Sequence, residues 1–197
     1  MQIIRIDTAQ RDLRLDVSAI FVEGFYQWLK FFSKDKAKLT RTFSHAFNPK
    51  VFFAAIEADT VLGFAACTND AVPSIKLVQH EFRRHLGFIK GTIAYRILKN
   101  EFEDKPYPFK MQAGMGAVEF VATASQYRGR GVATQIIQYI HENTPFKTYV
   151  LEVADTNTNA VQLYEKLGYQ VFKRVPEPHH KRSGFNFYLY MQYKKQQ

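Results

Sequence analysis

The residues with the clearest chemical potential form a glycine-rich turn, Gln126-Tyr127-Arg128-Gly129-Arg130-Gly131-Val132-Ala133. The turn follows a strand-like apolar run, Val118 to Thr123, and precedes a helical pattern. Glycines let the backbone pass close to a ligand with its amides pointing inward, and a helix N-terminus carries roughly half a positive charge. The turn therefore predicts a site for phosphate groups, which Arg128 and Arg130 would supplement.

Common phosphate-binding motifs do not match this turn. No lysine followed by Ser or Thr closes it, as a Walker loop requires, and Thr134 stands where the dinucleotide fingerprint has a third Gly or Ala. The alternative interpretation is a flexible strand-to-helix connection with solvated arginines. By itself the turn predicts phosphates and does not identify the molecule that carries them.

A second motif follows, Asn157-x-x-Ala160-x-x-Leu163-Tyr164-Glu165-Lys166-Leu167-Gly168-Tyr169. Together with Gln126-x-x-Gly129-x-Gly131 it resembles the two signatures of the GNAT superfamily of acyl-CoA N-acyltransferases, in the same order and spacing. The resemblance covers essentially the whole chain. It implies an α/β (α+β) fold with a mixed, mostly antiparallel sheet of about seven strands flanked by helices. That sheet would be splayed between strands four and five, where the pantetheine arm of acyl-CoA inserts.

The resemblance also implies roles for single residues. Main-chain groups of Val121 and Thr123 would pair with the pantetheine arm, a strand-four amide would stabilise the oxyanion, and Asn157 would contact the pantetheine side. Tyr164 would lie beside the thioester sulfur. The pyrophosphate would be held by backbone amides, those of Arg128, Gly129, Arg130, Gly131, Val132 and Ala133, with the Thr134 hydroxyl as an additional contact.

Tyrosine chemistry agrees with the role implied for Tyr164. An unperturbed tyrosine has a pKa of about 10, so its hydroxyl is protonated at neutral pH and can give a proton to a departing thiolate. The alternative is an amphipathic core tyrosine whose hydroxyl has a partner inside the protein.

An amine acceptor must lose a proton before or while it attacks, so a carboxylate or an ordered water is needed near the strand gap. Glu119 is the first candidate, because strand alternation places it on the face opposite to Val118 and Phe120. Glu152 on the next strand is the rival. For both residues a structural ion pair is an equally good interpretation.

Other reactive residue types give weaker signals. Cys67 lies in a strand-like run, where a buried, inert thiol is expected. His179 and His180, followed by Lys181 and Arg182, have no further ligands at a metal-binding spacing, so a solvated loop is expected and no metal is predicted.

Positioning these residues requires a series of elements that the apolar pattern predicts. A strand at Ile3–Ile6 precedes an amphipathic helix from Val17 to Phe32. A long helix, or two in tandem, runs from Ile75 to Ile97, with a kink or a close helix approach at Gly87 and Gly91. The remaining expected elements are a hairpin of 51–57 and 61–68, a loop at 104–116, a strand at 118–123, a helix ending at 143, a strand at 149–153, a helix capped by Thr156 or Asn157 and ended by Gly168, and strands at 169–175 and 185–193.

The first predicted helix carries an aromatic stripe of Phe21, Phe25, Trp28 and Phe32. A basic amphipathic helix of this kind can lie on an anionic membrane, but such stripes are more often core. We favour the core interpretation, with part of the helix lining the acceptor site as the family resemblance implies.

Composition limits the overall class of protein. The 197 residues are 46% apolar, which predicts one folded domain over 1–193 and a disordered tail at 194–197. Neither a secretory leader nor an apolar run of the roughly 20 residues needed to span a bilayer is visible, and the single cysteine excludes an intramolecular disulfide. We therefore expect a cytoplasmic protein. Its net charge of +9 favours anionic partners without choosing between nucleic acid, phospholipid and a polyphosphate.

The predicted function is transfer of an acetyl group from acetyl-CoA to a primary amine, by direct attack in a ternary complex and without a covalent enzyme intermediate. The acceptor, a small molecule or a protein, is left open, as are a longer acyl donor and a homodimer. No membrane partner is predicted. The alternatives are a catalytically silent acyl-CoA sensor and a basic nucleic-acid-associated module, for which no motif is found.

Overall fold

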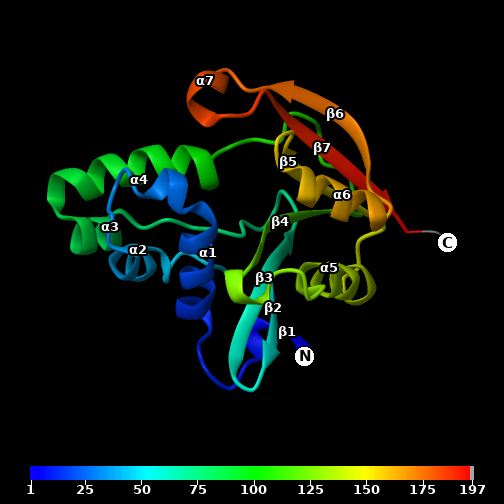
Figure 1. The fold of residues 1–197 in the computed structure, drawn as a ribbon, viewed down its shortest axis with the longest axis horizontal. Coiled ribbons are helices and arrows are strands. Elements are labelled where there is room, and N and C mark those ends of the chain that lie inside the picture. Colours follow the sequence, from blue (N-terminus) through cyan, green and yellow to red (C-terminus); the bar gives the residue numbers. More distant parts are fainter. Residues whose placement is uncertain (196–197) are drawn as a thin grey trace.

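The fold is organised around one seven-stranded sheet, seen in a computed structural model that describes residues 1–195 (Figure 1). The spatial order is β1-β2-β3-β4-β5-β7-β6; β4 and β5 run parallel and every other neighbouring pair is antiparallel. This confirms the predicted mixed, mostly antiparallel sheet. The strands are β1 (Gln2–Arg5), β2 (Phe52–Glu57), β3 (Thr60–Thr68), β4 (Met115–Thr123), β5 (Thr148–Ala154), β6 (Gln170–Pro176) and β7 (Phe187–Lys194).

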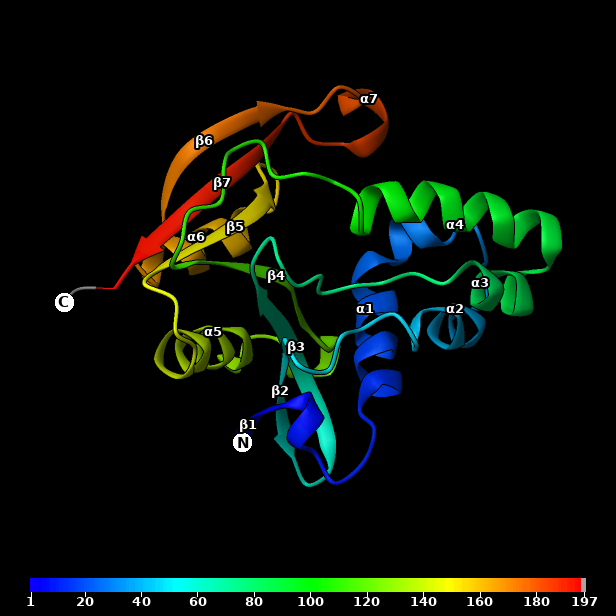
Figure 2. The same ribbon diagram turned by 180° about the vertical axis from the view of Figure 1, so that it is seen from behind.

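Helices cover both faces of the sheet (Figures 1 and 2). The group α1–α4 forms a lobe on one face, while α5 and α6 pack on the other. The helices are α1 (Arg14–Leu29), α2 (Lys36–Phe43), α3 (Gln79–Leu86), α4 (Phe88–Phe102), α5 (Val132–Asn143), α6 (Thr158–Lys166) and the short α7 (His180–Ser183), with 3-10 turns η1 (Ile6–Thr8) and η2 (Ser125–Tyr127).

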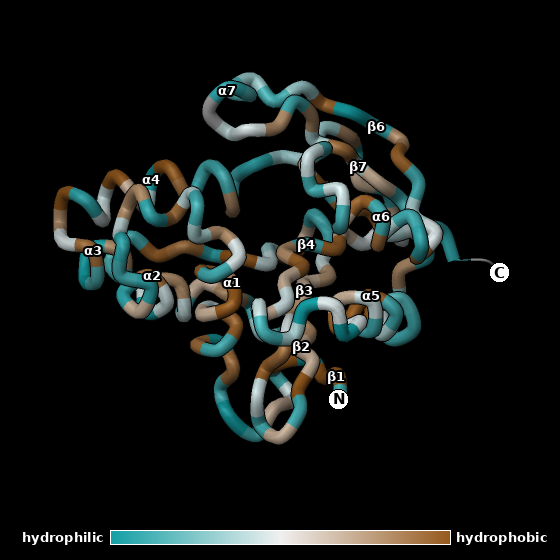
Figure 3. The backbone as a smooth tube through the Cα atoms, viewed as in Figure 1, coloured by the Kyte–Doolittle hydropathy of each residue, from teal (hydrophilic) through white to brown (hydrophobic). Residues whose placement is uncertain are grey.

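Strand alternation divides the apolar residues between two cores. Phe52 and Phe64 point into the cluster under α1–α4, whereas Phe53 and Cys67 point into the cluster under α5 and α6. Both faces of β2 and β3 are buried in this way, which explains why these strands read as nearly continuous apolar runs in the sequence and in Figure 3.

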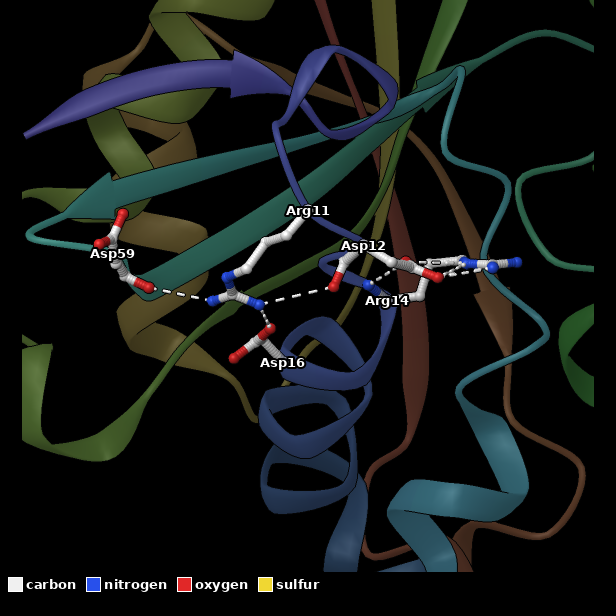
Figure 4. Close-up of polar contacts among 5 residues, drawn as sticks. All are labelled: Arg11, Asp12, Arg14, Asp16 and Asp59. Carbon is white, nitrogen blue, oxygen red and sulfur yellow. Dashed lines mark hydrogen bonds and ion pairs between the residues drawn. The ribbon is translucent and has the colours of Figure 1, made fainter.

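The predicted β2–β3 hairpin is confirmed, but its turn has only two residues, Ala58 and Asp59, both with positive φ, because Thr60 already pairs with Glu57. The Arg11 guanidinium, just before α1, donates to the Asp59 carbonyl at 3.0 Å and to the Asp16 carboxylate at 2.6 Å (Figure 4). This contact attaches the start of α1 to the end of the hairpin. These pairs are exposed, so each is expected to contribute about 1 kcal/mol or less.

The long helical pattern is divided into two helices, α3 and α4, at Gly87. This residue has φ of +85°, a backbone conformation that glycine adopts without strain. Gly91 in α4 lies against α3, where an added Cβ would be 2.4 Å from the Phe82 carbonyl oxygen. Thus the two alternatives for these glycines both occur, a break at Gly87 and a close approach at Gly91.

The predicted aromatic stripe is mostly core, as expected, but α1 ends at Leu29, so Phe32 lies beyond the helix that was predicted to include it. Phe21 and Phe32 are buried and Phe25 is half-buried, whereas Trp28 is 44% exposed. Within residues 1–195, no helix combines the length and the apolar character that crossing a membrane would need.

At the C-terminal end, β7 extends to Lys194, and the Lys195 amide donates to the Lys147 carbonyl at 2.9 Å. Lys194 and Lys195 belong to the segment predicted to be a disordered tail, so the last strand extends further than expected. Residues 196–197, the remainder of that segment, lie outside the described residues.

Candidate active site

The sheet opens between β4 and β5. Only three pairs connect these strands, the last joining Ala117 to Val150, and the chains diverge beyond it. Parallel strands normally pair along their length, so the early end of this ladder leaves backbone groups of both strands without a partner across the gap. This is the splay predicted between strands four and five.

A β-bulge shapes the β4 side of this opening. Ala66 pairs with Glu119 and Phe64 with Ala122, so β4 contains one more residue than β3 across this stretch. The extra residue is accommodated by Phe120, whose φ is +53°. Such a φ is unusual for a bulky residue, and strained backbone of this kind is found most often at functional sites.

The bulge corrects one expectation. Simple alternation predicted that Val118 and Phe120 would share a face, but Val118 packs under α5 and Phe120 packs under α1. Phe120 and Val121 have no partner in the register with β3, while Thr123 pairs with Gly63. The local sequence contains neither Gly nor Pro at the bulge, so it gave no signal of it.

The glycine-rich turn has the conformation that its sequence predicts. Gly129 and Gly131 have φ of +76° and +74°, and Gly131 is the N-cap of α5. The Gln135 amide donates to the Gly131 carbonyl at 3.0 Å, so the amides of residues 132–134 precede the first bond of the helix. These amides at a positive helix end form a cradle suited to an anion.

The two arginines of the turn have different surroundings. The Arg128 side chain donates to the Thr123 carbonyl at 3.4 Å and lies across the turn. Arg130 instead forms an ion pair with Glu57 at 3.0 Å and lies near the Tyr127 ring. Of the two, Arg128 is therefore more directly placed beside the cradle.

Gly63 on β3 supports this turn, and sequence reasoning did not identify it. A Cβ at Gly63 would be 2.7 Å from the Ala122 carbonyl oxygen and 3.0 Å from the Val132 side chain. Its lack of a side chain thus allows β3, the end of β4 and the first turn of α5 to pack closely. A lone glycine inside a β-like run was the available signal.

Glu119 lies two residues beyond the last β4–β5 pair, beside the gap. One carboxylate oxygen accepts from the Ser74 hydroxyl and the other from the Tyr107 hydroxyl. Burial raises the pKa of Glu119, the two hydrogen bonds lower it, and repulsion from Glu152 raises it again. The net effect is a raised pKa, and hence a stronger base than an ordinary glutamate.

Glu152 lies two residues beyond Val150, at the level of Glu119 on the other side of the gap. Its carboxylate accepts from Lys105 Nζ at 2.7 and 2.9 Å and from the Tyr190 hydroxyl. The two candidate bases therefore differ in their partners, because Glu152 is paired with a cation and Glu119 is held only by hydroxyls.

Tyr164 on α6 is 7% exposed and packs in the core cluster that contains Val118 and Leu151. Burial raises its pKa to about 12, so the hydroxyl is protonated at neutral pH. No hydrogen bond from this hydroxyl is found within residues 1–195. Among the described residues, the internal partner that the core-tyrosine alternative expects is thus not found.

Asn157 is the N-cap of α6, and its side-chain oxygen accepts from the Ala160 amide at 3.4 Å. At the other end of the helix, Gly168 has φ of +86°. Asn157 and Gly168 thus begin and end α6 as the second motif predicts, and orient Tyr164 toward the sheet.

The loop at 104–114 crosses the sheet on the side of β7 and β6. Lys173 donates to the Pro108 carbonyl at 2.6 Å, and Phe109 contacts the rings of Phe172 and Tyr190. Because Tyr107 from the same loop reaches Glu119, this loop forms a wall beside the candidate base.

The remaining reactive residues lie in inert surroundings. Cys67 is buried opposite Val118, and burial raises the pKa of its thiol to about 12. The solvated loop expected at His179 and His180 is instead the short helix α7, with His179 as its N-cap. The described residues include no cluster of three or more His, Cys, Asp or Glu able to hold a metal ion.

Comparisons with known proteins place this geometry in context. A family model described as "Acetyltransferase (GNAT) family" matches residues 20–169. A solved structure of an N-acetyltransferase from Staphylococcus aureus Mu50 is 17% identical, covers 98% of this chain and 100% of its own, and has a TM-score of 0.63. A GCN5-related N-acetyltransferase from Kribbella flavida is 21% identical, with 98% and 97% covered and a TM-score of 0.57.

A ribosomal-protein-alanine N-acetyltransferase from Brucella melitensis is also similar, at 14% identity, with 99% of this chain and 100% of that chain covered and a TM-score of 0.56. At such identities these likenesses show a shared fold. A comparison of the sequence with curated proteins finds no match.

Proposed function

The chain belongs to the GNAT acetyltransferase family, and from this membership we propose that it transfers an acetyl group from acetyl-CoA to a primary amine by direct attack in a ternary complex. Glu119 carries the proposal, because it is a carboxylate of raised pKa beside the gap between β4 and β5. Its position suits removal of the proton that the acceptor amine loses as its nitrogen attacks the thioester.

Acetyl-CoA fits the residues present at the site. The amides from Arg128 to Ala133, with the Thr134 hydroxyl, would hold its pyrophosphate, and the close packing at Gly63 keeps that turn in place. Backbone groups of Val121 and Thr123, together with Asn157, would hold the pantetheine arm in the gap. When bound, acetyl-CoA supplies an electrophilic thioester carbonyl.

The amine nitrogen forms the new bond to the acetyl carbon, and the bond from that carbon to sulfur breaks. Glu119 accepts the proton that the amine loses, and an amide of the β4 bulge stabilises the oxyanion. Tyr164 donates a hydrogen bond to the departing thiolate. Since the pKa of Tyr164 is about 12 and that of a thiol is about 8.5, complete proton transfer from Tyr164 is uphill.

The direct route does not use Cys67 as an acyl carrier. Only a thiolate is a strong nucleophile, and a thiol with a pKa of about 12 is almost entirely protonated at neutral pH.

The test combines calorimetry with a thiol-release assay. We expect acetyl-CoA and CoA to bind more tightly than ATP, because ATP offers phosphates to the cradle but no pantetheine arm to the gap. Release of CoA thiol should follow with at least one class in a panel of small amines, amino acids, polyamines and peptides. Binding without thiol release on any of these amines would favour a silent acyl-CoA sensor, and equal binding of ATP and acetyl-CoA would contradict the proposed role of the gap.

A further inference from the structure

The outward face of α4 carries a row of large aliphatic side chains. Ile89, Ile93 and Ile97 are spaced four residues apart and are 74%, 50% and 44% exposed. We call these three residues the α4 stripe. The inward face of the same helix contains the small residues Gly91 and Ala94, both buried. Leu98, near the end of the helix, is buried, so the usual arrangement, with large apolar residues inside, is reversed only in the first half of α4.

The break at Gly87 explains this reversal. In α3 the apolar pattern points inward, and Phe82 and Leu86 are buried. The positive φ of Gly87 changes the helix direction, and Gly91 must then face α3, because any Cβ there would be 2.4 Å from the Phe82 carbonyl oxygen. The stripe is consequently left on the solvent side, where Figure 3 shows hydrophobic residues along α4.

Basic residues border the stripe on both sides. At 100° per residue, Lys90 and Arg96 lie about 60° to either side of Ile93. Both are exposed, and neither has an ion-pair partner among residues 1–195. Around them the lobe is strongly basic, since residues 30–50 and residues 76–99 each contain six Lys or Arg and a single acidic residue. The rest of the chain is close to electrically balanced.

We propose that the α4 stripe docks on the surface of an anionic phospholipid bilayer. An aliphatic row bordered by Lys and Arg matches the boundary between acyl chains and anionic headgroups. Nucleic acid would satisfy the charges but would leave the isoleucines without apolar contacts. A second copy would satisfy the isoleucines but would bring two basic lobes together. The bilayer satisfies both features, and it differs from the membrane face considered in the sequence, whose phenylalanines are largely core.

The test is sedimentation of the protein with lipid vesicles. We expect binding to vesicles that contain phosphatidylglycerol, little binding to pure phosphatidylcholine, and loss of binding as salt is added. Ile93→Asp should weaken binding at least about tenfold, because it removes apolar contact and adds a repelled charge. The double variant Lys90→Gln/Arg96→Gln should weaken binding about twenty-five-fold, because each of the two charges contributes about fivefold.

Leu15→Asp is the matched control, because Leu15 on α1 is also exposed but lies outside the α4 stripe and outside the basic segments 30–50 and 76–99. It should bind like the wild type. Circular dichroism melting curves establish that the variants are folded, a readout independent of catalysis. The proposal is overturned if anionic vesicles do not bind the protein or if both aspartate variants lose binding equally. It is also overturned if light scattering shows a dimer that Ile93→Asp converts to monomers, since a second copy would then cover the stripe.

Discussion

At the residue scale, Glu119 and Glu152 are two side chains of the same type whose surroundings differ. Both lie two residues beyond the last β4–β5 pair, on facing strands. Lys105 forms an ion pair with Glu152, whereas the carboxylate of Glu119 accepts only from neutral hydroxyls, in a more buried place. The sequence named both residues as candidates, and their partners favour Glu119 as the base.

Replacing Glu119 with Gln should lower kcat/KM about a hundredfold, because a positioned general base contributes at least that much. In the wild type, kcat/KM should fall as pH decreases through the raised pKa of Glu119, since the protonated acid cannot accept a proton. This acid limb should disappear in Glu119→Gln. Thiol-release rates across pH provide the measurement, with Glu152→Gln as the matched control that keeps the limb.

Tyr164→Phe should lower kcat about tenfold with little change in KM for acetyl-CoA, since the hydrogen bond forms to a thiolate that develops in the transition state. The effect is smaller than that of a complete proton donor because the pKa of Tyr164 is about 12. Cys67→Ala, in the same core cluster, should leave kcat nearly unchanged. A collapse of turnover in Cys67→Ala would contradict direct transfer.

His141 is a buried residue with a structural role. Its Nε2 lies 2.7 Å from the Tyr169 hydroxyl, and its ring stacks on Tyr193 at 4.3 Å. Burial, aided by Lys195, lowers its pKa from 6.5 to about 4. Between pH 4 and pH 6.5 the unfolded chain therefore binds a proton at His141 that the folded chain does not bind. The stability that His141 contributes is complete above pH 6.5 and is lost as the pH falls toward 4.

From this shift in the pKa of His141 we expect the free energy of unfolding to decrease by about 3 kcal/mol between pH 6.5 and pH 4. Urea unfolding at pH 7 and pH 5 should show a larger loss for the wild type than for His141→Gln. His80→Gln, at an exposed histidine, should retain the wild-type loss. Equal pH dependence in the wild type and His141→Gln would assign the acid sensitivity to other groups.

At the scale of elements, two glycines in helices have opposite surroundings. Gly91 in α4 lies against the backbone of α3, whereas Gly24 in α1 has open space around it. The sequence alone does not distinguish them, because both lie within an apolar helical pattern. Only the packing of α3 against α4 makes Gly91 necessary.

Gly91→Ala should destabilise the protein by about 2 kcal/mol, because the contact at 2.4 Å is with backbone and α3 must move. Gly24→Ala should instead stabilise it by up to about 1 kcal/mol, through helix propensity and a smaller unfolded-state entropy. Thermal unfolding of the two variants gives the comparison. A neutral Gly91→Ala would mean that α3 and α4 are less closely packed than described.

At the scale of the whole molecule, the sheet has two halves, β1–β4 and β5–β7–β6, connected by three residue pairs. The gap between them is the space that we assign to acetyl-CoA. Amides of residues 118–122 that do not pair with β3 should exchange with deuterium quickly in the free protein and slowly after acetyl-CoA is added. Amides paired between β2 and β3 are the internal control, with no change expected. Unchanged exchange in 118–122 under saturating acetyl-CoA would place its pantetheine arm elsewhere.

The sequence by itself determined the order of the strands, the family and the positions of the glycine-rich turn and of Asn157, Tyr164 and Gly168, but it did not predict the helices α2 and α7. These features depend on local spacing, turn chemistry and helix caps, which are properties of neighbouring residues. The tertiary structure decided the rest: the bulge at Phe120, the partners of Glu119 and Glu152, the packing at Gly63, and the outward face of α4. Each of these depends on contacts between residues far apart in the chain, and local periodicity cannot report such contacts.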